Sequence, residues 1–502
     1  MVVAVAMVLA ANPGSAGAKK PPPPPPPSPS PSTTSTFIKN YADVVSGVEA
    51  DATPEDVQPT ADGGTITLAS VPSPSGVLVN WLTKLSDIGG IQWQEELGCL
   101  STPPGDYSIG VSLEGTKDGG YIVAGGTVGC GSGASCPATS GSTCGLVEKL
   151  TSTGAVSWAK VYNVGATGTS FNAILETVDG GYIATGSETS ADGIGGLVVK
   201  LDGTGNVVWH SQVGPSSSTQ VDFASIAQAS DGGFVAAGRL TTNSRFTLAV
   251  VKFGAAGTLL WERAYNNVTN GTPTSSVQPF SIIASRDGGY AVAGTWNSTT
   301  GPGTCCSGPL LLKLDSQGTI EFQRAYEGGV YCFFNGYSET CTSIGGIASA
   351  LQQTKDGGFI LAGASNIEMA DGVPLEPWLA RVDSAGQLVW QENDYRVNPQ
   401  TGRPLSENFA GVTITNTGFF ALGSTENLSN GRGELLGVST DSDGHVALSC
   451  SDEHSTALLS AADPGLVEVP PQLTATTASS AGQSAAPVTT LATSGTTTAP
   501  QC

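Results

Sequence analysis

Residues 174–214 read ILETVDGGYIATGSETSADGIGGLVVKLDGTGNVVWHSQVG and predict four short strands with nothing helical between them. The first two strands meet at Asp179-Gly180-Gly181 and the last two at Asp202-Gly203-Thr204-Gly205, and both are tight turns in which glycine tolerates a positive φ. One antiparallel sheet of four strands cannot bury both of its faces, so this unit must pack against copies of itself. The expected strands are 174–177, 182–186, 196–201 and 207–213.

Two markers repeat along the chain and count the copies independently. The first is the Asp-Gly-Gly turn, which begins at Asp62, Asp118, Asp179, Asp231, Asp287 and Asp356, with a degenerate copy at Asn416. The second is a glycine four residues before a large apolar residue: Gly89/Trp93, Gly154/Trp158, Gly205/Trp209, Gly257/Trp261, Gly318/Phe322, Gly386/Trp390 and Gly444/Leu448. Both markers count seven and they alternate strictly. Seven four-stranded units predict an all-β, seven-bladed β-propeller.

The segment Phe37-Ile38-Lys39-Asn40-Tyr41 copies the fourth strand of a unit, as a comparison with Trp158-Ala159-Lys160-Val161-Tyr162 shows. It precedes the first Asp-Gly-Gly turn, and residues 445–450 are the poorest copy of a fourth strand in the chain. We therefore expect residues 37–41 to pair into the last blade and to close the ring, which leaves no free sheet edge at the joint.

The order of strands sorts the connections onto two faces of the propeller. Turns between strands one and two and between strands three and four lie on one face, the short-turn face, and the other connections lie on the opposite, long-loop face. The insertions fall in the second set: 127–144, 295–309, 327–344, 365–377 and 393–407. Because function tends to reside on variable loops held by a rigid scaffold, we expect a ligand site on the long-loop face, at the mouth of the axial channel.

A basic residue lies five positions before the turn glycine of strand three in six units, and it belongs to the short-turn face. In the seventh unit Asn416 and Ser439 replace the acidic and the basic residue together. We therefore predict structural ion pairs, with a ring of cations that binds an anion as the functional alternative. The predicted pairs are Asp62–Lys84, Asp118–Lys149, Asp179–Lys200, Asp231–Lys252, Asp287–Lys313 and Asp356–Arg381.

The ten cysteines fall into groups with even numbers, which predicts five disulfides and an oxidising compartment. Metal binding fits less well, because the spacings are irregular and the chain has only three histidines. The pairing inside the two larger groups stays open. The groups are Cys99, Cys130, Cys136 and Cys144; Cys305, Cys306, Cys332 and Cys341; and Cys450 with Cys502.

The composition and the two ends of the chain predict where the protein is located. The 502 residues carry a formal charge of −22, which argues against nucleic acid and against anionic membranes as partners. Residues 1–18 form an apolar run that ends in Ala16-Gly17-Ala18 and predict a secretory signal peptide. Residues 19–36 are a proline-rich linker, 37–452 the propeller and 453–502 a Ser/Thr/Ala/Pro-rich tail, expected to be extended or disordered. The protein is therefore expected to be secreted, periplasmic or on the cell surface.

The segments KLDGTGNVVW (200–209), KLDSQGTIEF (313–322) and RVDSAGQLVW (381–390) are similar to the tryptophan-docking repeat of quinoprotein (PQQ-type) propellers. With the DGGY/F-x-x-AG segments, residues 37–450 resemble secreted bacterial propellers built from repeats of roughly sixty residues. The resemblance implies that each aromatic residue packs against the neighbouring blade. It transfers no cofactor ligand and no catalytic base to this chain.

Three functions follow from these observations. We favour a non-enzymatic binding or scaffold module for a protein, glycan or cell-surface ligand, with neither a cofactor nor a membrane span predicted, and the oligomeric state stays open. The alternatives are a quinoprotein-like oxidoreductase with PQQ and calcium, and a carbohydrate-active hydrolase or lyase that uses paired carboxylates. The segment Asp441-Ser442-Asp443-Gly444 lacks the third acid and the distal glutamate of a calcium loop, so it predicts a plain turn. The acids near the long-loop face are Asp106, Asp192, Asp222, Glu368, Asp371, Glu392 and Asp394.

Overall fold

The computed structural model describes a single ring of blades within the unit Ser35–Cys502. The described residues are 36–42, 44–45, 48–49, 51–73, 76–98, 107–128, 143–164, 167–214, 219–242, 245–266, 268–269, 272–273, 275–298, 307–327, 329–334, 339–365, 376–394, 408–426, 433–446 and seven short strands beyond residue 453. The predicted signal peptide and the proline-rich segment to residue 35 lie outside them.

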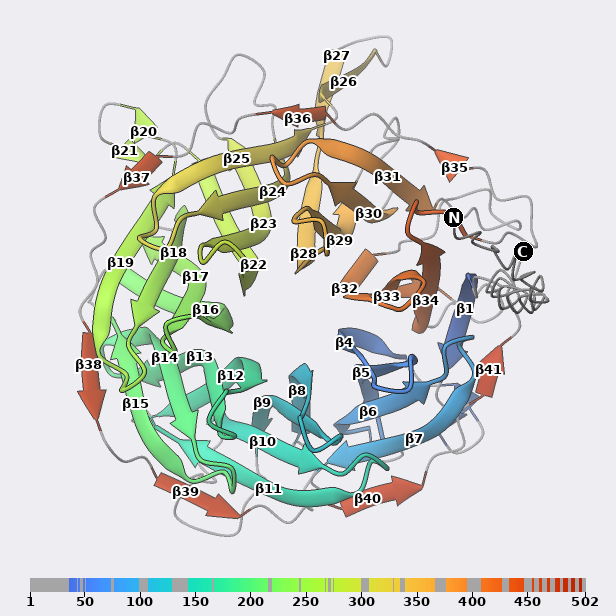
Figure 1. Ribbon diagram of the computed structural model, residues 1–502, viewed down its shortest axis with the longest axis vertical. Helices are drawn as coiled ribbons and strands as arrows, with labels where there is room; N and C mark the ends of the chain where they lie inside the picture. The colour runs from blue at the N-terminus through green and yellow to red at the C-terminus, as the bar shows by residue number, and fades with distance from the viewer. Residues whose placement is uncertain are drawn as a thin grey trace, which may run out of the picture. The chain divides into compact units, whose positions relative to one another are not determined.

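Seven four-stranded antiparallel blades surround a central axis (Figure 1), which confirms the predicted all-β propeller. Blades 1 to 3 are β4 (Thr53–Pro59), β5 (Thr65–Pro72), β6 (Leu78–Leu85) and β7 (Ile91–Gly98); β8 (Tyr107–Gly115), β9 (Tyr121–Val128), β10 (Cys144–Leu150) and β11 (Val156–Asn163); and β12 (Gly168–Glu176), β13 (Tyr182–Ser190), β14 (Gly193–Leu201) and β15 (Val207–Val213). Blades 4 and 5 are β16 (Thr219–Gln228), β17 (Phe234–Thr242), β18 (Arg245–Phe253) and β19 (Leu259–Asn266); and β22 (Ser275–Ala284), β23 (Tyr290–Ser298), β24 (Ser307–Leu314) and β25 (Ile320–Glu327).

The last two blades complete the ring. They are β28 (Gly346–Gln353), β29 (Phe359–Ser365), β30 (Glu376–Val382) and β31 (Leu388–Asp394); and β32 (Asn408–Ile414), β33 (Gly418–Glu426), β34 (Gly433–Asp441) and β1 (Phe37–Ala42). The N-terminal strand β1 is the fourth strand of blade 7, where Tyr41 pairs with Leu435 and Phe37 with Ser439. The predicted closure by residues 37–41 is therefore confirmed.

The first three strands of blade 3 are longer than the sequence predicts. They begin or end nearer the long-loop face, so that β12 starts at Gly168 instead of residue 174 and β13 continues to Ser190. On the short-turn face the turn residues show in the sequence where each strand ends. On the long-loop face the strands end in polar residues such as Ser187 and Thr189, which resemble loop residues in the sequence. The strands stay paired through these polar residues, because the hydrogen bonds between strands are made by main-chain groups and do not depend on apolar side chains.

The two glycines of the Asp-Gly-Gly turn have different roles. Gly180 has a φ of 79°, a conformation that a side chain disfavours, but a Cβ atom there would have nothing within 4 Å. At Gly181 a Cβ atom would lie 2.3 Å from the carbonyl oxygen of Leu201, the residue that ends strand three. The first glycine therefore forms the turn, and the second allows the turn to lie against the next hairpin.

A β-bulge interrupts the innermost strand of every blade at the same place. In blade 3 the extra residue is Asn172, and the strand bends so closely onto β13 that a Cβ atom at Gly186 would lie 2.1 Å from the Ser170 carbonyl oxygen. This explains why a glycine recurs at that position of strand two. The bulged residues are Glu55, Val111, Asn172, Ala224, Phe280, Ser349 and Ala410.

The aromatic residue of each fourth strand packs on the turn glycine of the next blade. The Trp158 ring lies 2.8 Å from where a Cβ atom of Gly205 would be, and Tyr162 Oη donates a hydrogen bond of 2.7 Å to the Gly205 carbonyl. The closing strand makes the same contacts, because Phe37 packs on Gly89 and Tyr41 Oη donates to the Gly89 carbonyl at 2.9 Å. The joint of the ring is therefore equivalent to the other interfaces.

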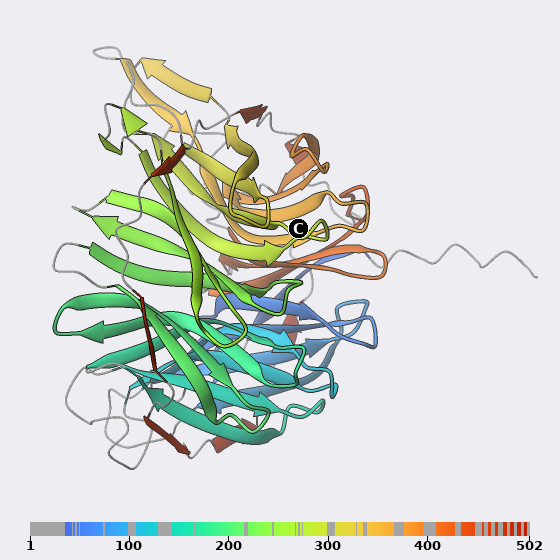
Figure 2. The same ribbon diagram turned by 60° about the vertical axis from the view of Figure 1, so that its left-hand side comes forward.

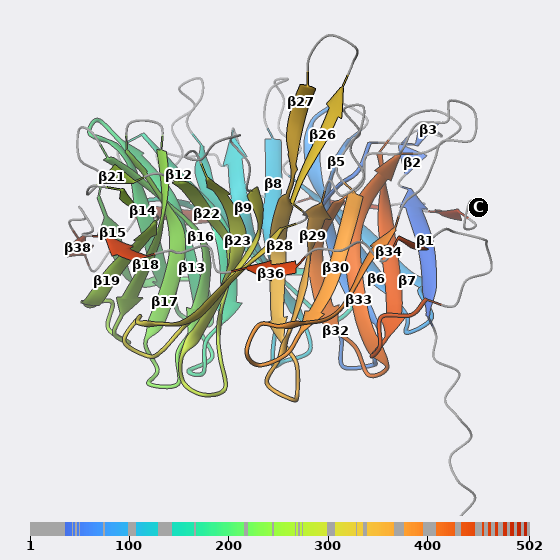
Figure 3. The same ribbon diagram turned by 90° about the horizontal axis from the view of Figure 1, so that it is seen from above.

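The connections from one blade to the next carry three further hairpins. These are β2 (Val44–Val45) with β3 (Val48–Glu49), β20 (Val268–Thr269) with β21 (Thr272–Pro273), and β26 (Gly329–Phe334) with β27 (Glu339–Ile344). Each follows a fourth strand, so each leaves the ring on the long-loop face, from which β26 and β27 project in Figure 3.

The C-terminal segment adds a fifth strand to the outer edge of every blade, which the sequence analysis did not predict. Figure 2 shows several of these strands, in red, along the outside of the ring. The sequence analysis expected an extended or disordered C-terminal segment. Its described residues are extended, but their pairing with the blades was not predicted. The strands are β35 (His454–Ser455), β36 (Ser460–Ala462), β37 (Val467–Val469), β38 (Ala475–Ala478), β39 (Gly482–Ala485), β40 (Thr489–Ala492) and β41 (Thr496–Thr498).

Candidate functional site

Six ion pairs join the Asp-Gly-Gly turn to the end of the third strand on the short-turn face. In blade 3, Lys200 Nζ lies 3.1 Å from Asp179 Oδ1 and also donates to the Leu201 carbonyl at 3.0 Å. The Lys200 side chain is 7% exposed and the Asp179 side chain 62% exposed, so solvent screening limits the pair to about 1 kcal/mol. All six pairs named from the sequence are present.

The aspartates of these pairs are stronger acids than usual. Partial burial acts to raise the pKa of Asp179, but hydrogen bonds from Thr177, Gly181 and Lys200 lower it to about 2. The same balance lowers the pKa of Asp118 and Asp287 to about 2. Each basic residue of the ring thus has a carboxylate partner, an arrangement typical of structural pairs and not of an anion site. In blade 7 the residue at the basic position is Ser439, which is buried, and the residue at the acidic position is the neutral Asn416.

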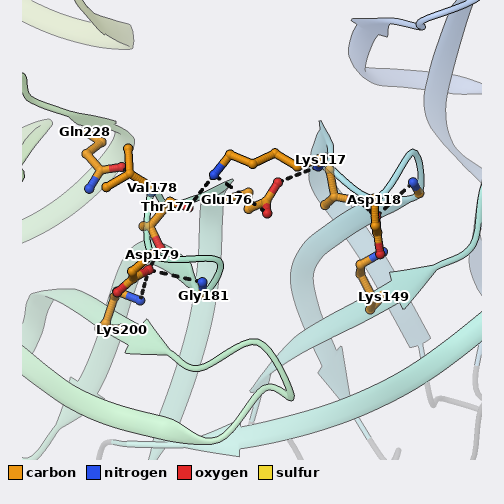
Figure 4. A network of polar contacts seen from close by, with 12 residues as sticks. Lys117, Asp118, Lys149, Glu176, Thr177, Val178, Asp179, Gly181, Lys200 and Gln228 are labelled. Carbon is orange, nitrogen blue, oxygen red and sulfur yellow. Dashed lines mark hydrogen bonds and ion pairs between the residues drawn. The ribbon is translucent and has the colours of Figure 1, made fainter.

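Further hydrogen bonds link neighbouring blades on the same face (Figure 4). The main-chain N–H of Lys117 donates to Glu176 at 2.6 Å, and Lys117 Nζ donates to the Thr177 carbonyl at 2.8 Å. One blade further on, the Val178 N–H donates to Gln228 at 2.9 Å. Polar groups on the short-turn face therefore hold the blades together.

The inner strands of all seven blades line a cavity of about 650 Å³ on the axis of the ring. Because the bulges turn one additional residue per blade toward the axis, the lining differs in chemistry from blade to blade. Its carboxylates are Glu55, Asp56, Glu114 and Glu176, all from blades 1 to 3, and its basic residue is Arg286 from blade 5. Blades 4, 6 and 7 line the cavity with small, amide and aliphatic side chains.

Burial makes several of these carboxyl groups weak acids. Desolvation, reinforced by the charges of Asp56 and Glu176, raises the pKa of Glu114 to about 8. Desolvation also raises the pKa of Asp56 to about 7, against hydrogen bonds from the N–H groups of Leu113 (2.8 Å) and Val57 (2.7 Å). The Leu113 bond crosses to the next blade, and Ser112 accepts the equivalent bond from Ile174 at 3.1 Å. Asp56 therefore occupies a position that joins blades elsewhere in the ring.

The acids predicted near the long-loop face do not form one described cluster. Asp222 lies 3.4 Å from Arg239 and accepts a hydrogen bond from Asn172 at 3.0 Å, so it joins blades 3 and 4. Asp192 is exposed in the turn between β13 and β14. Glu392 is partly buried on the fourth strand of blade 6. Asp106, Glu368, Asp371 and the side chain of Asp394 lie outside the described residues.

The disulfide predictions fall mostly outside the described residues. Cys144, the first residue of β10, is buried and disulfide-bonded. Cys332 and Cys341 are opposite each other in the β26–β27 register, which is compatible with a bridge between them. Their bonding, and the pairing in every group, stays a prediction. The placements of Cys99, Cys130, Cys136, Cys305, Cys306, Cys450 and Cys502 lie outside the described residues.

Metal ligands do not gather anywhere in the described part of the chain, where no three His, Cys, Asp or Glu side chains could hold an ion together. The turn at Asp441 has the hydrogen bonds of an ordinary Asx turn, because Asp441 accepts from the N–H groups of Asp443 and His445 at 2.9 Å each. Asp202 accepts the equivalent bonds in blade 3. Within the same described residues, the structure has no helix able to cross a bilayer.

The carboxylates of the axial cavity are the polar residues that the sequence analysis missed. Their signal is positional: each lies on the inner strand that leads into an Asp-Gly-Gly turn, at a position where the other full copies carry an uncharged residue. Glu176, for example, occurs three residues before Asp179, and Gln228 three residues before Asp231. An alignment of the units on this turn would have shown the position, although not its orientation toward the axis.

No family model and no curated protein matches this chain. Among solved structures, it is similar to a Dyadobacter fermentans protein of unknown function, with a TM-score of 0.38 and 10% identity over 80% of this chain and 99% of that chain. It is also similar to the polysaccharide lyase Uly1 (TM-score 0.36, 10% identity, 82% and 98% covered) and to a GH43_12 protein from a capybara gut metagenome (0.25, 8%, 88% and 98%). These similarities are too weak to argue an activity. The resemblance to quinoprotein propellers stays a prediction.

Proposed function

We propose that the protein is an exported, non-enzymatic β-propeller that binds a protein, glycan or cell-surface ligand through its long-loop face. The difference between its two faces carries this proposal. On the short-turn face the polar residues form ion pairs within blades and hydrogen bonds between blades. The opposite face carries the long connections between strands and between blades, which include the described hairpins β2–β3, β20–β21 and β26–β27.

A rigid ring with connections of unequal length on one face is a scaffold suited to binding. The interfaces between blades repeat the same docking contacts, so the long loops can differ in length and sequence without disturbing the ring of blades. The lining of the axial cavity includes Glu176 and Gln228, which join blades on the short-turn face, so the proposed binding surface is formed by the long loops. These loops leave different blades, so a ligand can contact several blades at once.

The test compares variants on the two faces. Replacing residues 328–345, which include β26–β27, with a short Gly-Ser linker should leave the melting temperature nearly unchanged and weaken ligand binding at least tenfold (about 1.4 kcal/mol). The matched control is Lys117→Ala on the short-turn face, where the Lys117 side chain is 62% exposed. Binding is measured by affinity electrophoresis on a β-glucan, an alginate and a chitooligosaccharide, and by biolayer interferometry on purified cell-envelope fractions.

Three results would contradict the proposal. Equal loss of binding in Lys117→Ala and in the hairpin variant would remove the preference for one face. New reducing ends or an unsaturated sugar product would show a hydrolase or a lyase. A quinone absorption band after reconstitution with PQQ and calcium, together with dye reduction, would show an oxidoreductase.

A further inference from the structure

The outer strands from the C-terminal segment follow the ring in reverse order. β35 pairs with β31 of blade 6, and the next strands pair in turn with blades 5, 4, 3, 2 and 1, before β41 pairs with β1 of blade 7. Every pairing is antiparallel. The fourth strands run along the circumference toward the next blade (Figure 1), so an antiparallel partner must run the opposite way round. The reverse order is thus a geometric consequence of the pairing.

The seven pairings share one register. In each blade we take the residue four positions after the docking aromatic, such as Tyr162 after Trp158 or Tyr265 after Trp261. Its partners in the C-terminal segment are His454, Ala461, Glu468, Ala475, Gln483, Thr490 and Thr497. Successive partners are seven residues apart, apart from one step of eight between Ala475 and Gln483. One repeat of the segment therefore corresponds to one blade.

The sequence of the segment contains the same repeat independently of the coordinates. Leucine recurs at Leu459, Leu466 and Leu473, at steps of seven and two residues before the partners Ala461, Glu468 and Ala475. A segment without a role in the ring would have no reason to keep this spacing.

We propose that residues 454–498 are a belt: an intramolecular ligand of the seven outer strand edges, bound by main-chain hydrogen bonds with one short strand per blade. Without the belt, each fourth strand would present an unpaired edge, the kind of surface that recruits strands from other chains. The belt pairs with these edges along the main chain. It also holds the ring closure, because β1 lies between β34 and β41 and is paired on both sides.

The experiment cuts the belt from the folded full-length chain. A protease site inserted between Ser451 and Asp452 is cleaved under reducing conditions, because Cys450 and Cys502 are a predicted disulfide pair. Retention of the released fragment is then followed by size-exclusion chromatography and its dissociation by a fluorescent label. We expect the fragment to stay bound, since seven short strands on one chain act as a multivalent ligand.

Two deletions test the register. Deleting Pro470 and Pro471 shortens the step between β37 and β38 from seven residues to five, which reduces its reach from about 23 Å to about 16 Å. Only part of that belt can then pair at one time, so dissociation should be faster by a factor on the order of 10². The matched control deletes Ala481 from the step of eight, which leaves seven residues, and should dissociate like the unchanged belt.

The outcomes separate clearly. Release of the unchanged fragment as fast as that of the shortened one would overturn the proposal, and so would equal effects of the two deletions. A dimeric mass for the uncut chain in light scattering would place the belt of one copy on another and would overturn the intramolecular assignment. Amide exchange in the uncut chain gives a second measurement, in which β15 and β19, the partners of β38 and β37, should exchange faster only in the variant that lacks Pro470 and Pro471.

Discussion

The first and the fourth strands of the blades differ in which side-chain contacts recur from blade to blade. At the outer strands, an aromatic residue packs on the next blade's turn glycine and a hydroxyl often donates to its carbonyl, as Tyr162 does to Gly205 and Ser211 to Gly257. At the inner strands the bulged position holds Glu55 in blade 1, Asn172 in blade 3 and Phe280 in blade 5. The docking contacts of the fourth strands are repeated around the ring, whereas the bulged positions differ, and among them Asn172 donates to Asp222 of the next blade. The axial cavity is therefore where blades acquire individual chemistry.

The largest effect is expected from removing the strand that closes the outer ring. Deleting residues 36–42 removes Phe37 and the buried Tyr41 from their contacts with Gly89. We expect a loss of more than about 4 kcal/mol and a broad, non-cooperative melt, because removing one buried aromatic side chain already costs about 3–5 kcal/mol. Calorimetry checks this, with deletion of residues 21–31 from the proline-rich run as the control. An unchanged melt would refute the closure.

A second prediction separates the two glycines of one turn. Gly181→Ala should cost about 3 kcal/mol or more, because the new Cβ atom would lie 2.3 Å from a backbone oxygen that cannot move aside. Gly180→Ala should cost about 1–2 kcal/mol, because it introduces only the strain of a φ near 79°. Urea unfolding of both variants measures the difference. Equal costs would show that strand three can move away from the turn.

Buried carboxyl groups near the inner strands predict that stability depends on pH. Glu148 is fully buried between blades 1 and 2, where desolvation raises its pKa to about 7 despite a hydrogen bond of 3.1 Å from Asn80. The folded state then binds more protons than the unfolded state above about pH 4.5, so stability should fall as the pH rises from 5 to 8. Glu148→Gln should reduce this fall by about 1–3 kcal/mol. Urea midpoints at pH 5 and pH 8 test it, and equal slopes in both proteins would contradict it.

The smallest effect belongs to the repeated ion pairs of the short-turn face. Asp179→Asn should cost about 1 kcal/mol at pH 7, because the side chain of Asp179 is 62% exposed and the pair is partly screened. Its pKa is lowered to about 2, so its contribution is present above pH 4 and is lost as the pH falls toward 2. The variant and the natural protein should therefore converge in acid. A constant difference between pH 7 and pH 2 would assign the cost to lost hydrogen bonds and not to charge.

The sequence alone determined the number of blades, the closure by residues 37–41 and the partners in the six ion pairs. These features arise from short-range requirements: a turn needs a glycine such as Gly180, and a docking aromatic needs a small neighbour such as Gly205. Each requirement selects a residue type, and the ring repeats it once in nearly every blade.

Only the tertiary structure decided what lies on the axis and what lies on the rim. Glu55 and Glu114 are ordinary acids in the sequence and become weak acids because seven separate strands exclude water around them. The residues of β38 pair with β15 through main-chain groups, which every residue except proline carries as both donor and acceptor. Such pairing constrains the spacing of the strands and not the type of side chain. The position of a Ser/Thr/Ala-rich segment on the ring therefore becomes visible only in the tertiary structure.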